Sequence, residues 1–149
     1  MPKENRTIKR ALDVLELFKN EQKPMTITQI SNYFDIPRSS ASDILTTLFL
    51  EGYIELADNY QKSYVLGLKA FEIGAGYLHN NDLSPSARPY LEKLMSISES
   101  TAFLAIESKG QLVYLDKVEA PSSVRTSAQL GSRSDMYCTG LGKALLASY

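Results

Sequence analysis

The amino-acid sequence of 149 residues predicts an α+β protein whose N-terminal part places three helices before a β-hairpin. Two observations carry this prediction. Apolar residues recur with the period of an α-helix in several stretches before Gly52. The residues that follow alternate between apolar and polar, as the residues of a half-buried strand do, and they surround a cluster of turn formers.

The composition is ordinary for a globular protein, with 44% hydrophobic and 22% charged residues and a net charge of −1. We expect a cytoplasmic protein without a membrane partner, because no apolar run reaches membrane-spanning length and no signal peptide is recognisable. The single cysteine, Cys138, excludes an internal disulfide and a cysteine-based zinc site. With one histidine, His79, a histidine-dependent triad is improbable, and we expect no cofactor, no metal and no enzyme activity.

The first helix is expected over Thr7–Phe18, with Thr7 as its N-cap. Its predicted buried stripe consists of five apolar residues, Ile8, Ala11, Leu12, Leu15 and Phe18. Basic residues gather at the same end of the chain, where Glu4 alone opposes Lys3, Arg6, Lys9 and Arg10. Arg6 and Arg10 could reach phosphates, or could serve only to solvate the helix.

A brief strand is expected at Met25–Ile27, followed by a second helix that Thr28 caps and that runs to about Phe34. Asp35 comes next, at a tight corner between two helices. Aspartate tolerates the left-handed backbone that such a corner often needs.

The third helix is expected within Ile36–Gly52, with Pro37 in its first turn and Gly52 as a left-handed cap. Its apolar face consists of Ala41, Ile44, Leu45, Leu48 and Phe49. The opposite face carries short polar side chains, Ser39, Ser42, Asp43 and Thr46. A helix face selected only for solubility usually carries lysine and glutamate. This face is therefore expected to lie against another molecule.

Two short strands, Tyr53–Ala57 and Ser63–Leu66, are expected to form a hairpin around the turn formers of 58–62. The order helix, short strand, helix, tight turn, helix, hairpin is the winged helix–turn–helix arrangement. Its last helix normally enters the major groove of DNA, and its hairpin, the wing, lies along the DNA backbone.

The predicted DNA contacts lie on the third helix, at the start of the second and in the wing: Thr28, Arg38, Ser39, Ser40, Ser42, Asp43, Thr46 and Lys62. Arg38 is the strong donor for guanine or phosphate, and the serines suit phosphate oxygens near a helix start. The alternatives are a solvated helix face, simple capping by Thr28, and a solvated turn lysine at Lys62.

The next helix is expected over Gly67–Leu78, and apolar residues on more than one of its sides suggest burial against both the first domain and a partner chain. The predicted dimerisation stripe consists of Leu68, Phe71, Ala75 and Leu78, although a buried core helix would show the same stripe. A polar break at His79–Asp82 is the expected boundary. We therefore predict a DNA-binding domain at 1–66, a linker helix at 67–81 and a further domain at 82–149.

In the last part, Ser84 is expected to cap a helix whose first residue is Pro85 and whose core stripe is Ala87, Leu91, Leu94 and Met95. A hairpin follows, with strands Ala102–Glu107 and Gln111–Val118 joined at Lys109 and Gly110. Residues 119–134 are predicted to be loop-rich, with an extended piece at 123–126. Gly140-Leu141-Gly142 then opens a final helix over Lys143–Tyr149.

A phosphate-binding loop at Gly142-Lys143 is excluded for two reasons. Tyr137 stands where that motif requires glycine, and Ala144 stands where it requires serine or threonine.

Four stretches together resemble the IclR family of transcriptional regulators: TIKRALDVLELF, IPRSSASDILTTLFLEGYIE, SYVLGLKAFEIG and CTGLGKALLAS. The resemblance implies a winged helix–turn–helix, a dimerising linker helix and a ligand-sensing α/β domain with a GAF-like fold. It also implies operator binding as a dimer or a dimer of dimers, modulated by small organic acids or aromatic metabolites. Gly140 and Leu141 match the part of the sensing pocket that binds the ligand, and Cys138 and Thr139 lie beside them. The alternative there is a glycine-rich helix start without a ligand.

Two features depart from the family pattern. The sensing domain normally continues well past the last matching helix, so we expect this chain to hold its first part only. The position of Asp43 is commonly basic in relatives. An acid there repels phosphates, but it can accept a hydrogen bond from a cytosine amino group.

The predicted function is sequence-specific, effector-modulated DNA binding by a dimeric transcriptional regulator, with repression and activation both open. The alternative is a winged-helix module for protein–protein interaction that senses no effector.

Overall fold

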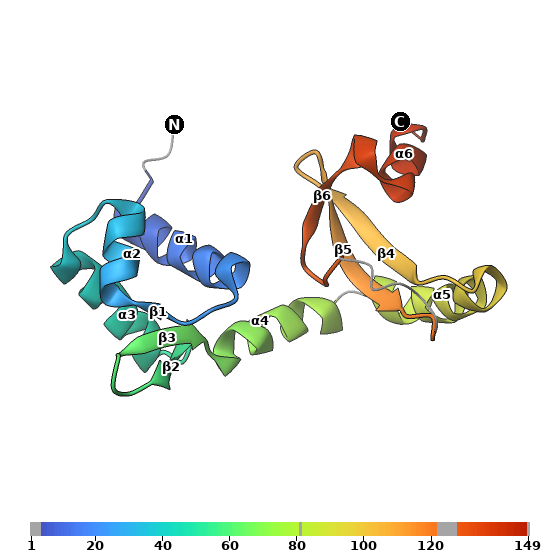
Figure 1. The fold of residues 1–149 in the computed structure, drawn as a ribbon. Coiled ribbons are helices and arrows are strands. Elements are labelled where there is room, and N and C mark those ends of the chain that lie inside the picture. Colours follow the sequence, from blue (N-terminus) through green and yellow to red (C-terminus); the bar gives the residue numbers. More distant parts are fainter. Residues whose placement is uncertain (1–3, 81, 122–127, 149) are drawn as a thin grey trace. The chain divides into compact units, whose positions relative to one another are not determined.

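The computed structural model describes residues 4–80, 82–121 and 128–148, and it forms two compact units, Met1–Gly76 and Tyr77–Tyr149 (Figure 1). Within the described residues there are six α-helices and two three-stranded sheets, which confirms the predicted α+β class. Lys3, the predicted extended piece at 123–126 and the predicted helix end at Tyr149 lie outside these residues. No helix in the described ranges is both long and apolar enough to cross a bilayer.

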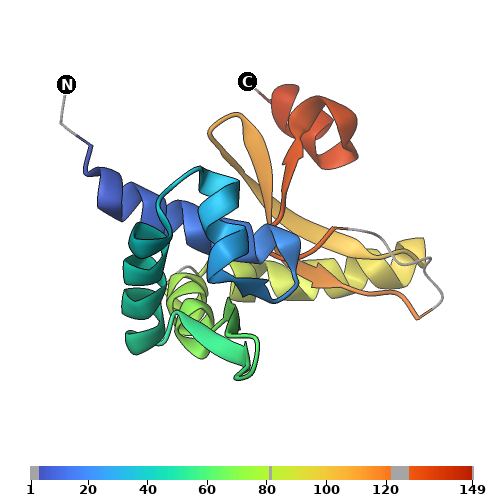
Figure 2. The same cartoon turned by 60° about the vertical axis from the view of Figure 1, so that its left-hand side comes forward.

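Three helices of the first unit, α1 (Arg6–Glu21), α2 (Ile27–Phe34) and α3 (Arg38–Leu50), enclose one apolar core. Figure 2 shows α3 at the edge of this unit, crossing α1. The core holds buried residues from the three helices and from the segments that join or follow them: Val14, Leu17, Phe18, Met25, Ile30, Ile36, Ala41, Ile44, Leu45, Leu48 and Ile54.

Helix α1 differs from its prediction at the cap and on the buried face. Asn5 is the N-cap, and its Oδ1 accepts hydrogen bonds from the amides of Thr7 at 3.0 Å and Ile8 at 3.2 Å. Ile8 and Leu12 are exposed, whereas Val14 and Leu17 are buried. Two overlapping apolar stripes fit the helical period here, and the packing of α3 selects the one that contains Val14.

Strand β1 (Met25–Thr26) leads directly into α2, and Thr26 is the N-cap in place of the predicted Thr28. Thr26 forms a capping box with Gln29. Its hydroxyl accepts from the Gln29 amide at 3.4 Å, and its own amide donates to Gln29 Oε1 at 2.8 Å. The predicted left-handed backbone at Asp35 is confirmed, with φ of +49°.

In α3 the predicted buried residues Ala41, Ile44, Leu45 and Leu48 are confirmed. Pro37 is the N-cap instead of a first-turn residue. Phe49 is partly exposed and meets the ring of Tyr64 edge-on, with ring centroids 6.3 Å apart. Gly52 has φ of +78°, as predicted, and its amide donates to the Phe49 carbonyl at 3.0 Å.

The predicted wing is confirmed as strands β2 (Ile54–Asp58) and β3 (Ser63–Leu66), in a sheet of order β1-β3-β2. The register shifts between Leu56 and Asp58, so Ala57 forms a bulge next to the tip. At the end of the wing, Gly67 approaches another part of the backbone closely. A Cβ at Gly67 would lie 2.4 Å from the Gly52 carbonyl oxygen, so only glycine fits there.

Helix α4 (Leu68–His79) follows at once, and none of its residues is buried. Its exposed apolar side chains are Leu68, Phe71, Ile73, Tyr77 and Leu78. Ala75 is half-buried.

In the second unit, α5 (Leu83–Ser98) packs on the hairpin of β4 (Ala102–Ser108) and β5 (Gln111–Val118), as both views show (Figures 1 and 2). Leu91 of α5 meets Ala102 and Val118 in a small core. Lys109 and Gly110, with φ of +57° and +78°, form the predicted two-residue turn. Strand β6 (Arg133–Asp135) pairs with β5 where the sequence predicted loop.

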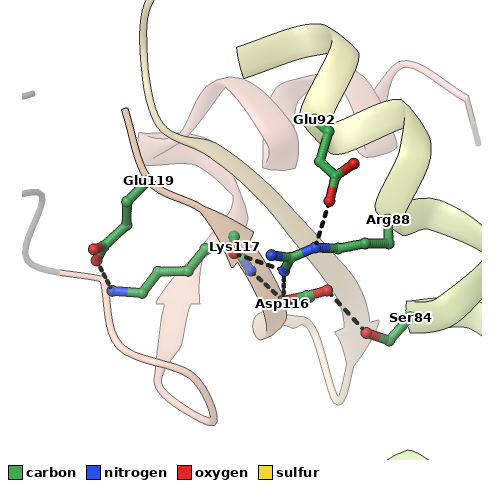
Figure 3. A network of polar contacts seen from close by, with 6 residues as sticks. All are labelled: Ser84, Arg88, Glu92, Asp116, Lys117 and Glu119. Carbon is green, nitrogen blue, oxygen red and sulfur yellow. Dashed lines mark hydrogen bonds and ion pairs between the residues drawn. The ribbon is translucent and has the colours of Figure 1, made fainter. Parts of the chain in front are cut away.

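The predicted cap and stripe of α5 are partly wrong, because Asp82 is the N-cap and Leu94 is exposed. Ser84 instead donates its hydroxyl to Asp116 Oδ2 on β5 at 3.0 Å (Figure 3). Arg88 also bridges α5 to β5, since its Nη1 lies 3.1 Å from Asp116 Oδ1 and 3.2 Å from the Lys117 carbonyl oxygen. Polar contacts thus fix the first half of α5 to the sheet.

The chain ends in a short 3-10 helix, η1 (Met136–Cys138), and helix α6 (Gly140–Leu146). Helix α6 begins at Gly140, three residues before the predicted start, because Thr139 caps it. The Thr139 hydroxyl accepts from the Gly142 amide at 3.0 Å.

Candidate nucleic-acid interface

The outer face of α3 presents short polar side chains to solvent. Ser39, Asp43 and Thr46 are all exposed, and their spacing of i, i+4 and i+7 places them on one helix face. The buried residues of α3 occupy the other side, so the core holds this face outward.

Arg38 is the first residue of α3 and is exposed. The N-cap residue Pro37 makes no side-chain hydrogen bond to the helix start. The first amides of a helix lack partners within the helix and attract anions. Arg38 and the start of α3 therefore present positive charge at the same point.

Ser40 and Asp43 lie toward α1, where they line a groove of about 370 Å³ that also includes Thr7 and Arg10. Ser40 and Ser42 are half-buried. The predicted set is thus divided: Ser39 and Thr46 face outward, Ser40 faces α1, and Asp43 takes part in both surfaces.

The positive charge of the N-terminal basic cluster is partly neutralised by an acidic neighbour. Lys9 Nζ lies 2.9 Å from Asp13 Oδ1. This hydrogen bond and the charge of the carboxylate raise the pKa of Lys9. Arg6 and Arg10 are exposed, and Arg10 borders the groove beside α3.

Lys62 is exposed on the wing with φ of +48°, and Thr28 is exposed in the first turn of α2. Two exposed side chains in this region are not among the predicted contacts. Leu50, one turn beyond Thr46, is 76% exposed, and Tyr60 at the wing tip is 97% exposed. An aromatic residue within a run of turn formers was the available signal for Tyr60.

The predicted effector residues surround the start of α6. Cys138, Gly140 and Leu141 are exposed, and Thr139 is half-buried. Cys138 Sγ lies 3.0 Å from the Asp135 carbonyl oxygen. Gly142 is buried against η1, because a Cβ there would lie 2.0 Å from the Met136 carbonyl oxygen.

Replacing Gly142 with alanine should therefore force η1 away from α6. We expect Gly142→Ala to lower the free energy of unfolding by about 1–3 kcal/mol, as overpacking does. Urea denaturation measures this change. Gly140→Ala is the matched control, because nothing lies within 4 Å of its added methyl and it should be neutral or slightly stabilising. Equal effects at the two glycines would contradict the close packing at Gly142.

The fold and this surface define a class of protein, the winged helix–turn–helix DNA-binding proteins. Three helices hold the polar face of α3 outward, and a hairpin stands beside it.

Comparisons with known proteins agree. The family model described as the IclR helix-turn-helix domain matches residues 7–57, and that of the bacterial transcriptional regulator IclR C-terminal matches residues 75–149. This chain belongs to the IclR family of transcriptional regulators, which are not enzymes.

Two curated relatives are each 32% identical to this chain. The regulator BhcR of Paracoccus denitrificans aligns over 95% of this chain and 50% of its own length. The repressor AllR of Escherichia coli K12 aligns over 93% and 51%. The chain therefore spans about half the length of the curated relatives it matches.

Solved structures give the same fold. The IclR of Thermotoga maritima is 28% identical, with a TM-score of 0.71 over 95% of this chain and 56% of that one. An IclR homolog of Microbacterium hydrocarbonoxydans, crystallised with 4-hydroxybenzoate, is 22% identical, with a TM-score of 0.80 over 95% and 58%. The second likeness concerns the fold alone.

Proposed function

We propose that this chain binds operator DNA as a dimer, with α3 in the major groove, and that a small-molecule effector modulates the binding. The observation that carries the proposal is the exposed polar face of α3 with Arg38 at its start. In this assignment residues 1–66 bind DNA, 67–81 form the linker helix, and 82–149 belong to the effector-binding domain.

The proposed DNA contacts on α3 are Arg38, Ser39, Ser42, Asp43 and Thr46. They are joined by Ser40 toward α1, Thr28 on α2 and Lys62 on the wing. Arg38 would donate to guanine or phosphate, and Thr46 and the serines would position the helix. Asp43 is the acceptor for a cytosine amino group.

Dimerisation is supported by an apolar groove in the first unit. Its volume is about 690 Å³, and Leu68 and Phe71 of α4 line it together with Leu15 of α1 and Leu66 of the wing. Ala75 and Leu78 continue the stripe along α4. A dimer doubles the phosphate contacts, which matters for a chain with a net charge of −1.

For the effector site, Gly140 and Leu141 supply the first backbone amides of α6, where a carboxylate is favoured, and Cys138 and Thr139 lie beside them. The Microbacterium relative was crystallised with 4-hydroxybenzoate, a small aromatic acid, so that ligand class comes first. A rise in melting temperature with one member of a panel of small carboxylates is expected. If no member of the panel raises the melting temperature, this would count against an effector site in this chain.

Selection from a random duplex library, at low and at physiological salt, tests DNA binding. We expect one two-fold symmetric sequence to be enriched and its affinity to fall steeply with salt. If no duplex is retained even at low salt, DNA binding is wrong and the protein–protein interaction module is favoured.

A further inference from the structure

The tip of the wing carries an exposed aromatic side chain, Tyr60, that the predicted DNA contacts do not include. We propose that Tyr60 packs its ring into the minor groove of DNA, beside the major groove that α3 enters. This inference rests on the proposed function and adds a residue that fixes the wing on its DNA site.

Tyr60 has no packing role in the folded unit. Its 97% exposure is the highest among the exposed large apolar residues of the described chain. The ring pairs within the described ranges join Tyr33 to Phe34, Phe49 to Tyr64 and Phe103 to Tyr114, and none includes Tyr60. Replacing Tyr60 should therefore leave the folded unit intact.

The backbone beneath Tyr60 is held in place. Asp58 Oδ1 accepts hydrogen bonds from the amides of Tyr60 at 2.7 Å and Gln61 at 3.4 Å, which forms an Asx turn. The bulge at Ala57 and the left-handed Lys62 fix the two sides of the tip. A side chain presented on a fixed loop loses less conformational entropy when it binds.

The neighbours of Tyr60 match the minor groove. Asn59, Gln61 and Lys62 offer amide donors and an ammonium group, and Asp58 uses one carboxylate oxygen on the two backbone amides. The floor of the minor groove carries base acceptors, its walls are sugars, and its potential is negative. The ring fits the sugar walls, and its hydroxyl can donate to the acceptors.

The same surroundings disfavour a protein partner. Energetically dominant aromatic residues in protein interfaces lie in well-packed, desolvated pockets, whereas the residues beside Tyr60 in the tip are polar.

The first test uses a short duplex enriched by the selection described above. Tyr60→Ala should weaken binding about tenfold, because it removes the apolar ring that packs against the sugar walls of the groove. Tyr60→Phe should stay within about threefold of wild type, because it keeps the ring. The salt dependence should not change with Tyr60→Ala, whereas Lys62→Ala should reduce its slope by about 1 per protomer.

The second test uses fluorescence, because the chain contains no tryptophan. Tyr60→Trp places the one tryptophan of each protomer at the wing tip. Its emission, excited at a wavelength that the tyrosines do not absorb, should be quenched when the duplex is added. Tyr90→Trp, at an exposed position on α5, is the matched control and should not respond.

A modified duplex locates the contact. Diaminopurine in place of adenine adds an amino group to the minor groove and leaves the major-groove edge unchanged. It should weaken wild type more than Tyr60→Ala. If wild type binds the duplex and Tyr60→Ala binds equally well, the inference is overturned while the proposed function stands. If wild type binds no duplex, the proposed function is wrong, and the inference about Tyr60 is wrong with it.

Discussion

Replacing Arg38 with glutamate is expected to abolish specific DNA binding. The substitution removes the strong donor at the start of α3 and places a carboxylate where a phosphate or guanine would lie. One bidentate contact to a base is worth about 1–3 kcal/mol, and a symmetric dimer loses it twice. The loss should therefore be at least about a hundredfold. Fluorescence anisotropy with the selected duplex measures it.

Lys93→Glu is the matched control for this experiment. It makes the same reversal of charge at an exposed residue of α5, in the second unit. Its effect should stay within about threefold, because Lys93 is not among the proposed DNA contacts and an exposed charge that makes no contact is screened by salt. Both variants should melt like wild type, since both positions are exposed. Wild-type affinity of Arg38→Glu would mean that the predicted recognition helix is misplaced.

Replacing Phe71 with arginine is expected to dissociate the proposed dimer. Phe71 is 71% exposed within one chain and lines the apolar groove next to Leu68. Burying such a side chain contributes about 1.5–3 kcal/mol, and burying a guanidinium in its place is unfavourable. Analytical ultracentrifugation should therefore record monomers. Operator affinity should fall at least about tenfold, even though the variant is more positively charged.

Ile73→Arg provides the control for Phe71→Arg. It adds the same charge to an exposed position of α4 that does not line the groove. It should remain dimeric and bind DNA at least as well as wild type. A dimeric Phe71→Arg, or equal dissociation by both variants, would contradict the assignment of the groove to the dimer interface.

The sequence predicted the core of α3 correctly because one apolar stripe, including Ala41 and Leu45, fits the helical period there. Helix α1 has two overlapping stripes, and periodicity alone could not decide between Ile8 and Val14. The packing of α3 makes that choice. Periodicity therefore finds helices more reliably than it finds their buried faces.

The N-caps of α2 and α5 were predicted wrongly for a different reason. Two threonines two residues apart competed for the start of α2, and the capping box to Gln29 selects Thr26. Ser84 has the residue type of a cap, but it bonds Asp116, which lies 32 residues further along the chain. A tertiary contact of this kind overrides local preference and leaves no local signal.

The candidate DNA interface was predictable in outline because a short polar helix face is visible in the sequence. The division of its members was not, since the turning of Ser40 toward α1 depends on how α1 and α3 cross. Tyr60 could have been predicted as well, because an aromatic residue within the predicted turn of 58–62 has no strand neighbours to cover it.

The close approach at Gly67 has a mechanical consequence. The Gly67 amide donates to the Tyr53 carbonyl at 2.8 Å, and the Lys69 amide donates to the Gly52 carbonyl at 3.2 Å. One residue separates the wing from α4, and hydrogen bonds clamp it from both sides. This connection is rigid, so a rotation of α4 about its axis turns the hairpin with it. In the proposed function, a rotation of this linker helix would therefore be passed on to the DNA-binding domain.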